Sequence, residues 1–341
     1  MDKELYFGVD VSKKTLDLAY YDGETIDWKN AHIKVSNDDA GFKKIGSWVA
    51  KVGKDFDTFL FCMEYTGLYN QNFRLWLESK EYIYGMVEPR KMHHFEPDLD
   101  DDQRSLDRIK TDELDAFRIA IYCEQNHKKI LRNPSKLPSP VYLKLKRLLV
   151  ERKQNTKQST LCKQQLHDTC AYDTDFSVER KKLLLKNMQE NQKAIDKEID
   201  SYIQEDASIS KNYDLLTSIP GIGRIIALET IVLTENFTAI SNPRKYACYI
   251  GIAPFKKESG TSVRKKTGVS KKGFSEAKAD LSIAVLSAIK NNPSIRDYWI
   301  RKRKEKCGGI VLNAVKFKLV LRMFAVIKRG TPYVETDAYK N

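Results

Sequence analysis

The sequence of 341 residues predicts an α/β domain at the N-terminus, a long helical middle and a mainly α-helical C-terminal domain. In the first third, short runs of β-branched and aromatic residues alternate with stretches of helical periodicity. A proline-rich segment at 132–140 is typical of a linker, and strongly helical, highly charged sequence follows it. We therefore expect three domains, over residues 1–135, 136–210 and 211–333.

The N-terminal domain combines short strands and helices. Its continuous apolar run, TFLFCMEY, is typical of a strand that is buried on both faces of a sheet. The expected elements are strands over 5–12, 15–21 and 26–35, a helix over 38–52, a strand over 58–65, a helix over 68–80, a strand over 82–87 and a helix containing 109–126. Three strands followed by alternating helix and strand is the order of a ribonuclease-H-like sheet, although other α/β folds share this pattern. The acidic segment 96–107 is expected to be a mobile surface loop.

The middle of the chain, residues 141–205, has the pattern of a long helical pair. One half carries an apolar stripe formed by Leu184, Met188, Ile195, Ile199 and Tyr202. In the other half the core positions are interrupted by Arg152, Asn155 and Gln158. We expect a coiled coil that serves oligomerisation or grips nucleic acid.

The C-terminal domain begins near residue 212, and its segment SIPGIGRIIA has the core of a helix-hairpin-helix. In such a motif, Gly221 and Gly223 let the backbone approach a phosphate, and the helix that begins near Arg224 offers its N-terminal amides. An ordinary tight turn between two helices is an equally good interpretation. Further helices are expected over 275–291, 294–305 and 310–328, with glycines at 308–309 separating the last two.

The charge balance indicates a polyanionic partner. Lys and Arg outnumber Asp and Glu by 59 to 46, which gives a formal net charge of +13. Such a surplus favours nucleic acid over a membrane, because no apolar run approaches the roughly 20 residues of a spanning helix. The N-terminus has neither signal-peptide nor transit composition, and the six cysteines form no CxxC pair, as expected of a cytoplasmic protein with reduced thiols. Zinc binding at Cys162, His167 and Cys170 is disfavoured, because no fourth ligand has suitable spacing.

Four acidic residues are candidates for a metal site. Asp10 and Glu64 each stand where an expected strand ends, and Asp112 and Asp115 lie three residues apart at the start of an expected helix. With Thr111 as N-cap, the second pair has a simpler explanation, because acids in a first turn interact favourably with the helix dipole. If all four converge, Mg²⁺ would relieve their repulsion, and two ions about 4 Å apart would activate an attacking oxygen and stabilise a leaving one.

A basic segment, FKKESGTSVRKKTGVSKKG, follows Pro254. Its cations are Lys256, Lys257, Arg264, Lys265, Lys266, Lys271 and Lys272. Such a run is often a solvated face, but the small hydroxyl residues within it suggest a loop that lets a backbone phosphate come close. Ser259 is a candidate hydrogen-bond acceptor, phosphate contact or nucleophile. Nucleophilic attack is the least favoured of these on physical grounds, because no histidine lies nearby to act as base.

Taken together, these segments resemble a known family. GVDVSKKTLD, MEYTGLY, VEPRK, KTDELDA, IPGIG and YIGIAPFKKESGTSVRKKTGVSKKG occur in the order found in the DEDD transposases of bacterial insertion sequences. This is the insertion sequence 110 family, which is related to the Piv-type DNA invertases. The resemblance covers about residues 5–130 and 212–330, and the helical middle is similar in character alone.

The resemblance implies a RuvC-like domain whose acidic tetrad matches Asp10, Glu64, Asp112 and Asp115. It also implies a transposase domain whose serine nucleophile falls in the SG pair after GIAPF, which is Ser259 here. The family commonly has two serines before that glycine, whereas this chain has Glu258 there and offers Thr261 and Ser262 further on. Family members are guided by a structured bridge RNA, a partner that would suit the basic helical middle.

The sequence therefore predicts a DNA recombinase that cuts and rejoins strands during transposition, as a dimer or tetramer in the bacterial cytoplasm, close to the nucleoid. In this prediction, Mg²⁺ held by the tetrad positions groups at a phosphodiester, and Ser259 attacks it to form a phosphoserine link. One alternative is a RuvC-like endonuclease that uses metal-activated water. Another is a non-catalytic scaffold that binds RNA or DNA.

Overall fold

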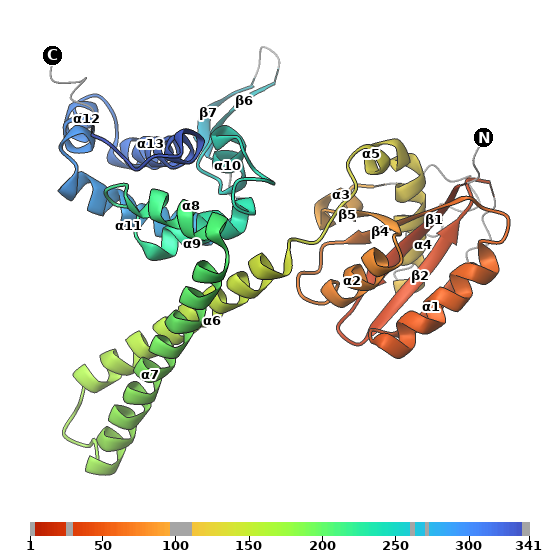
Figure 1. Cartoon of the computed structure of the whole chain (residues 1–341), viewed down its shortest axis with the longest axis horizontal. Helices are drawn as coiled ribbons and strands as arrows, with labels where there is room; N and C mark the ends of the chain where they lie inside the picture. The colour runs from red at the N-terminus through yellow and green to blue at the C-terminus, as the bar shows by residue number, and fades with distance from the viewer. Residues whose placement is uncertain (1–3, 25–29, 96–110, 260–262, 270–272, 336–341) are drawn as a thin grey trace. The chain divides into compact units, whose positions relative to one another are not determined.

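The structure is a computed structural model that describes residues 4–24, 30–95, 111–259, 263–269 and 273–335 (Figure 1). Of residues 256–259 and 263–267 only the backbone is described. The expected acidic loop at 96–107 lies outside the described residues. The chain divides into two compact units, residues 1–137 and 138–341.

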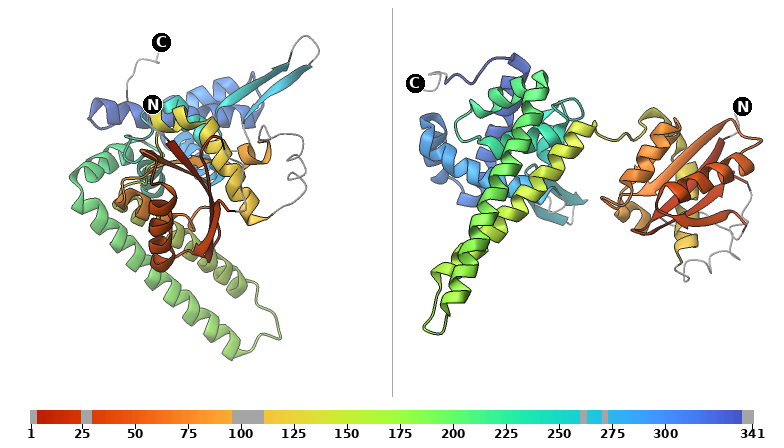
Figure 2. Two further views of the ribbon diagram at one scale, coloured as in Figure 1. Left: turned by 90° about the vertical axis from the view of Figure 1, so that its right-hand side faces the viewer. Right: turned by 60° about the horizontal axis from the view of Figure 1, so that its bottom comes forward.

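The first unit is built on a mixed sheet with the strand order β3-β2-β1-β4-β5 (Figures 1 and 2). Its strands are β1 (Glu4–Val11), β2 (Thr15–Tyr21), β3 (His32–Ser36), β4 (Thr58–Glu64) and β5 (Ile83–Val87). β1 is antiparallel to β2 and β2 to β3, whereas β1, β4 and β5 run parallel. This is the strand order expected of a ribonuclease-H-like sheet, and the prediction of an α/β N-terminal domain is confirmed.

Helices cover both faces of this sheet. They are α1 (Asp39–Val52), α2 (Gln71–Ser79), α3 (Pro89–His93), α4 (Asp112–Gln125) and α5 (His127–Arg132). α1 and α2 pack on one face around Phe7 and Phe61, and α4 and α5 pack on the other around Leu60 and Cys62. Burial on both faces explains why the sequence of β4 is continuously apolar.

Some details of this unit differ from the prediction. β3 begins at His32 instead of residue 26, and residues 25–29 lie outside the described residues. The helices α3 and α5 were not predicted, because elements of five and six residues carry too little periodicity to be recognised.

Close packing of α4 on β1 fixes the position of the helix over the strand. A Cβ atom added at Gly8 would lie 2.0 Å from the carbonyl oxygen of Ala116 and 2.2 Å from the amide nitrogen of Ala120. Only glycine allows two backbones to approach this closely. The first turn of α4, one turn before Ala116, therefore lies near the end of β1, where Asp10 stands.

The second unit begins with two long antiparallel helices, α6 (Pro140–His167) and α7 (Asp175–Glu205), which are joined by polar side chains (Figure 1). Arg152 Nε donates to Asp196 Oδ1 at 2.7 Å. Asn155 Nδ2 donates to the carbonyl oxygen of Met188 at 2.8 Å and to Gln192 Oε1 at 3.1 Å. Two of the polar residues that interrupt the predicted core pattern therefore make the contact between the helices.

Apolar burial along this helical pair is sparse. Its buried residues are Leu145, Cys162, Ile199 and Ile203. Of the predicted apolar stripe, Ile199 is buried, whereas Leu184 at the far end is exposed. Supercoiling of the two helices stays a prediction.

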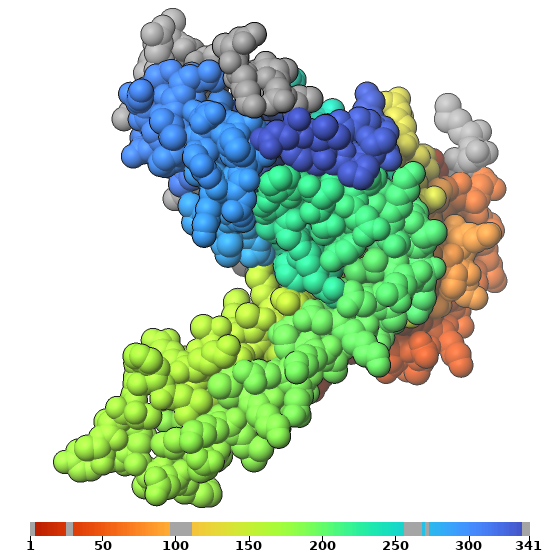
Figure 3. All heavy atoms as spheres, turned by 60° about the vertical axis from the view of Figure 1, so that its left-hand side comes forward, coloured from red at the N-terminus to blue at the C-terminus, as the bar shows by residue number. Residues whose placement is uncertain are grey.

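The remaining described helices of the second unit form one core. They are α8 (Ala207–Thr217), α9 (Arg224–Thr234), α10 (Pro243–Tyr249), α11 (Ser275–Asn291), α12 (Pro293–Arg303) and α13 (Gly308–Arg329). The core includes Leu228 and Leu319, and Leu145 of α6 and Ile199 of α7 join it. Figure 3 shows the rest of the helical pair, in yellow-green, extending from this core. The prediction of a largely helical remainder is confirmed.

Two details of the C-terminal prediction are wrong. Gly308 and Gly309 form the first turn of α13, and the break after α12 lies at residues 304–307 instead. The basic segment after Pro254, expected to be a loop, is largely an antiparallel hairpin of β6 (Pro254–Ser259) and β7 (Val263–Val269). Lysine-rich composition hid these strands, because alternation of apolar residues is the main strand signal. None of the described helices is both long and apolar enough to cross a membrane.

Candidate active site

Four charged residues form one row across the sheet of the first unit. Lys34 of β3 pairs in register with Asp17 of β2, and Asp17 pairs with Asp10 of β1. Glu64 of β4 stands beside Asp10, because each directly follows the last paired residues of these parallel strands. Alternate residues of a strand share one face of a sheet, so Asp10 lies on the same face as Gly8, against which α4 packs.

The first turn of α4 brings two more acids to this edge. Thr111 has an extended backbone, and its hydroxyl oxygen accepts a hydrogen bond from the Leu114 amide at 3.4 Å, so it caps the helix as expected. Asp112 and Asp115 follow within that turn. Helix capping therefore explains why α4 starts here. The same turn also brings Asp112 and Asp115 near Asp10, which capping does not require.

The acids lie close enough to alter the protonation of Asp10. Burial, followed by the negative charges of Asp112, Asp115 and Asp17, raises the pKa of the Asp10 carboxyl to about 6. Carboxylates gathered this closely carry a surplus of negative charge, which a bound cation would relieve. Three residues of the expected tetrad are thus coupled electrostatically, and Glu64 stands at the end of the neighbouring strand.

Sequence reasoning missed further residues of this edge. Asp17 is buried, and its carboxylate lies 3.1 Å from Lys34 Nζ and 3.0 Å from His32 Nε2. Lys34 Nζ also donates to Asp112 Oδ2 at 3.2 Å. Asp17 could have been found from the sequence, because it is the single acid within the apolar strand TLDLAYY. Lys34 has no local signal, because its place depends on how β3 pairs with β2.

The donor chemistry of this edge fits a hard divalent cation, which prefers carboxylate oxygens. Asp10, Glu64, Asp112 and Asp115 are the residues that would hold it. Within the part of the chain that the structure describes, no three His, Cys, Asp or Glu side chains gather closely enough to hold one metal ion. The ammonium group of Lys34 instead supplies positive charge between Asp17 and Asp112.

The candidate nucleophile, Ser259, is the last residue of β6 and pairs with Val263 across the hairpin. The alternatives Thr261 and Ser262 lie outside the described residues. At the foot of the hairpin, the Phe274 amide donates to the carbonyl oxygen of Tyr249 at 3.0 Å. The hairpin is therefore anchored at α10 while it extends away from the helices of its unit (Figure 1).

The same hairpin carries most of the predicted phosphate-binding cations. Lys256 and Lys257 belong to β6, and Arg264, Lys265 and Lys266 belong to β7. Lys257 stands opposite Lys265, and Glu258 opposite Arg264. Lys271 and Lys272 lie outside the described residues. The backbone alone therefore brings five of the seven cations into one ribbon with Ser259.

Two family models match this chain. One, described as Transposase and specific to the DEDD transposases of IS110 elements, matches residues 7–170, which contain all four acids of the tetrad. The other, described as Transposase IS116/IS110/IS902 family, matches residues 213–300, which contain the Ser259 hairpin. The chain belongs to the IS110 family of transposases. It is therefore an enzyme of DNA transposition and recombination, whose family uses a divalent metal.

Individual proteins are also similar to this transposase, and two of them match 96% of its length. The pilin gene-inverting proteins of Moraxella lacunata and Moraxella bovis are each 23% identical over 330 residues, which cover 96% of this chain and 97% of theirs. An uncharacterized 43.6 kDa protein of the insertion element IS110 from Streptomyces coelicolor is 28% identical over 120 residues, or 35% of this chain and 29% of that protein.

In this transposase, the PGIG segment forms the turn between α8 and α9. Gly221 has a φ of +94°, and a Cβ atom there would lie 2.7 Å from the Cβ of Ala288, so glycine is required by both backbone and space. Gly223 is the N-cap of α9 and has open space around it. A groove of about 430 Å³ runs along this turn and α11. The start of α9 has no side-chain cap among the described residues, and this agrees with both interpretations of the motif.

The side chain of Arg224 points to the helical pair. Its guanidinium donates to Asp200 Oδ1 at 2.5 Å and to the carbonyl oxygen of Asp196 at 2.9 Å, both on α7. Phosphate binding by this side chain would require it to leave those partners. Any binding at the turn therefore depends first on the backbone near Gly223.

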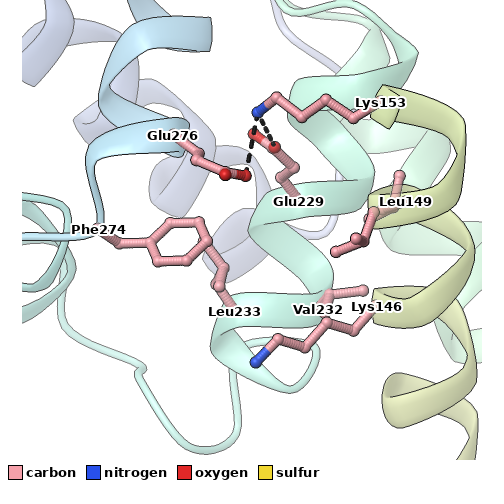
Figure 4. A pocket seen from close by; sticks show the side chains of 9 residues that line it. Lys146, Leu149, Lys153, Glu229, Val232, Leu233, Phe274 and Glu276 are labelled. Atoms are coloured by element: carbon pink, nitrogen blue, oxygen red, sulfur yellow. Dashed lines mark hydrogen bonds and ion pairs between the residues drawn. The ribbon is translucent and has the colours of Figure 1, made fainter. Parts of the chain in front are cut away.

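A second cluster of ionisable groups lies where α6, α9 and α11 meet (Figure 4). Lys153 Nζ lies 2.9 Å from Asp280, 3.3 Å from Glu276 and 3.7 Å from Glu229. Burial and the neighbouring Asp280 raise the pKa of Glu229 to about 8, against the opposing effect of Lys153. Glu229 is therefore largely protonated at neutral pH, and the cluster ties the helical pair to the C-terminal core.

Proposed function

We propose that this transposase cuts and rejoins DNA strands by means of an acidic metal site and a serine nucleophile. The observation that supports this best is the convergence of Asp10, Asp112 and Asp115 at one sheet edge, in the segment that matches the DEDD transposases. Glu64 completes the proposed set of ligands at the next strand end. When bound there, Mg²⁺ would activate an attacking oxygen and stabilise a leaving one.

Ser259 is the proposed nucleophile. Its Oγ forms a bond to phosphorus, the bond from phosphorus to one DNA oxygen breaks, and the leaving DNA hydroxyl gains a proton as the serine loses one. Because one phosphodiester replaces another, the phosphoserine link retains the energy needed to rejoin DNA. Attack by a DNA hydroxyl on this link reverses the exchange and frees the serine. The match of Ser259 to the family's serine and its position beside five cations support this role.

Trapping the covalent link tests this proposal. Wild-type enzyme, incubated with DNA of its element ends and Mg²⁺, should yield a protein–DNA species that survives denaturation. Ser259→Ala should abolish both this species and recombination, and Asp115→Asn should do the same while DNA binding persists. Ser262→Ala is the matched control, because it removes a hydroxyl three residues further along the chain and should retain the adduct. Cutting by wild type without any adduct would instead support an endonuclease that uses metal-activated water.

We further propose that a structured RNA guides this reaction and that the enzyme works as a homo-oligomer. The resemblance to bridge-RNA-guided recombinases and the net charge of +13 support an RNA partner. Purified protein should carry element-encoded RNA and have a mass above that of one chain by light scattering. Nuclease-treated protein that stays monomeric, beside untreated protein free of RNA, would contradict both statements.

A further inference from the structure

The positive charge of this chain is concentrated in its last two described helices. Residues 293–330, which span α12 and α13, contain eleven Lys or Arg and two acids, a surplus of nine in a chain whose total surplus is thirteen. This segment lies beyond the Ser259 hairpin, and only its first eight residues fall within the matched family segment 213–300. Its charge is therefore not explained by the hairpin or by the proposed chemistry.

Several of these cations are held over aromatic rings. Lys318 Nζ of α13 lies 4.3 Å from the ring centre of Tyr298 on α12, and the Arg322 guanidinium lies 5.1 Å from that of Tyr333. Arg322 Nη2 also donates to Ser294 Oγ at 2.9 Å. Cations held in this way lose less conformational freedom when they bind an anion. We call Tyr298, Arg301, Lys318 and Arg322 the α12–α13 face.

This face gathers more positive charge than the nearby acids, Asp297 and Glu305, can balance. Burial and the charges of Arg322 and Arg301 lower the pKa of Lys318. Among the described residues, Arg301, Lys318 and Arg322 form no ion pair, and Glu305 is engaged by Lys302 at 2.7 Å. Like charges held together in this way cost free energy in the free protein, and a bound polyanion would recover it.

Two hydrogen-bond donors beside this face also lack an acceptor. Arg322 Nη1 and Trp299 Nε1 are both covered from solvent, and neither has a hydrogen-bond partner among the described residues. A covered donor without an acceptor is costly, and most such groups in proteins are paired. Since Nη2 donates to Ser294 and the guanidinium lies over Tyr333, Nη1 is a donor of Arg322 that an anion at this face would satisfy.

We propose that the α12–α13 face binds the phosphodiester backbone of a nucleic acid, as a site separate from the Ser259 hairpin. The inference rests on the proposed function only in that nucleic acid is the partner of this enzyme. A surplus of positive charge, prepositioned cations and an unpaired guanidinium donor together match a chain of phosphates. Phosphate contacts of this kind position the nucleic acid and carry no sequence recognition.

The test compares two variants that lose the same charge. Arg301→Gln combined with Lys318→Gln neutralises the α12–α13 face, whereas Lys44→Gln combined with Lys51→Gln removes two exposed cations of α1 in the other unit. Binding to duplex DNA and to a structured RNA is measured by fluorescence anisotropy over a series of salt concentrations. All measurements are made in chelator, so the result does not depend on the metal, on Ser259 or on cleavage. Thermal denaturation verifies that both variants are folded.

We expect the variant of the α12–α13 face to lose about two phosphate contacts. The plot of log K against log salt should therefore become less steep, by about 1.8 on duplex DNA. The affinity of this variant near physiological salt should fall at least tenfold, and the α1 variant should fall much less. A loss on DNA alone would assign the face to DNA, and a loss on RNA alone would assign it to RNA. Equal slopes for the two variants on both nucleic acids would overturn the proposal. So would unchanged nucleic-acid binding together with lost binding to anionic phosphatidylglycerol vesicles.

Discussion

At the scale of single residues, Lys34 controls the charge of the acidic edge. It lies between the buried carboxylate of Asp17 and the exposed carboxylate of Asp112, so one ammonium group is shared by two acids on different elements. A divalent cation that binds Asp112 has to compete with this ammonium group. Lys34 and the metal are therefore alternative sources of positive charge at one place.

Replacing Lys34 by Met should make the folded state depend more strongly on metal. Without metal, we expect a melting temperature lower by about 2–4 °C, equivalent to about 1 kcal/mol, because the acids lose their cation. Addition of Mg²⁺ should then raise the melting temperature more than it does in wild type. Lys43→Met, on the exposed side of α1, is the control. A variant whose melting temperature responds to Mg²⁺ as wild type does would show that Lys34 and metal do not compete.

Some residues of the site could be predicted from the sequence alone, and others could not. Asp10 and Glu64 were predictable, because a strand that ends in an acid can be recognised locally, and parallel strands bring such ends together. Lys34 was not predictable, because its neighbours belong to β2 and α4, far away in the sequence. The role of Ser259 came from family resemblance, since its local sequence offers no base.

At the scale of elements, the contact of α4 with β1 decides whether the acids meet. Gly8→Ala should destabilise the first unit by about 1–3 kcal/mol, because the added methyl group would overlap the backbone at Ala116 and Ala120. DNA cleavage should be lost as well, since α4 would have to move away from Asp10. Chemical denaturation and a cleavage assay measure the two effects.

Gly46→Ala is the matched control for that substitution. Gly46 lies within α1, and a Cβ atom there would meet Trp76 at 3.6 Å, an ordinary contact distance. Alanine favours a helix by about 1 kcal/mol over glycine, so this variant should be as stable as wild type or more stable. If Gly8→Ala were as stable and as active as Gly46→Ala, α4 could not pack on β1 as closely as described.

The cluster around Glu229 predicts a pH-dependent stability of the second unit. Lys153 of α6, Tyr246 of α10 and the acids Asp280 and Glu276 of α11 face this carboxyl. Because its pKa is raised from 4.5 to about 8, the folded state binds the proton more tightly than the unfolded state does. The free energy of unfolding should therefore fall as the pH rises from about 5 to about 8.

Glu229→Gln should remove most of this dependence, because the amide keeps the shape of the protonated carboxyl and cannot ionise. At pH 8 we expect the variant to be more stable than wild type by about 1–3 kcal/mol, given about 1.4 kcal/mol for each pKa unit. Urea denaturation at several pH values measures this. Glu276→Gln, at a half-exposed partner of the same lysine, should leave the pH dependence nearly unchanged. Parallel pH profiles for wild type and Glu229→Gln would refute the assignment.

Long elements were predictable, and their interfaces were less so. The helices α6 and α7 follow from continuous helical periodicity over many turns. The role of Asn155 in joining them was not visible, because a polar residue at a core position looks like a defect until its partner, Gln192, is known. The strands β6 and β7 were missed for the related reason that their lysines do not alternate with apolar residues.

At the scale of the whole molecule, the two halves of the proposed chemistry belong to different compact units. The acids lie in residues 1–137 and Ser259 lies in residues 138–341. An assembly of several chains therefore has two ways to complete a reaction centre, from one chain or from two. The second way does not require any single chain to be intact in both units.

Inactive variants of the two units should therefore divide into two complementation groups. Asp115→Asn and Ser259→Ala are each expected to be inactive alone, whereas a mixture of the two should regain adduct formation, because one chain supplies the acids and the other the serine. A mixture of Asp115→Asn with Asp112→Asn should stay inactive, since both lesions affect the same unit. If no mixture of acid and serine variants recovers, each chain completes its own centre. For a cell that carries several copies of such an element, recovery would mean that two differently damaged copies can mobilise each other.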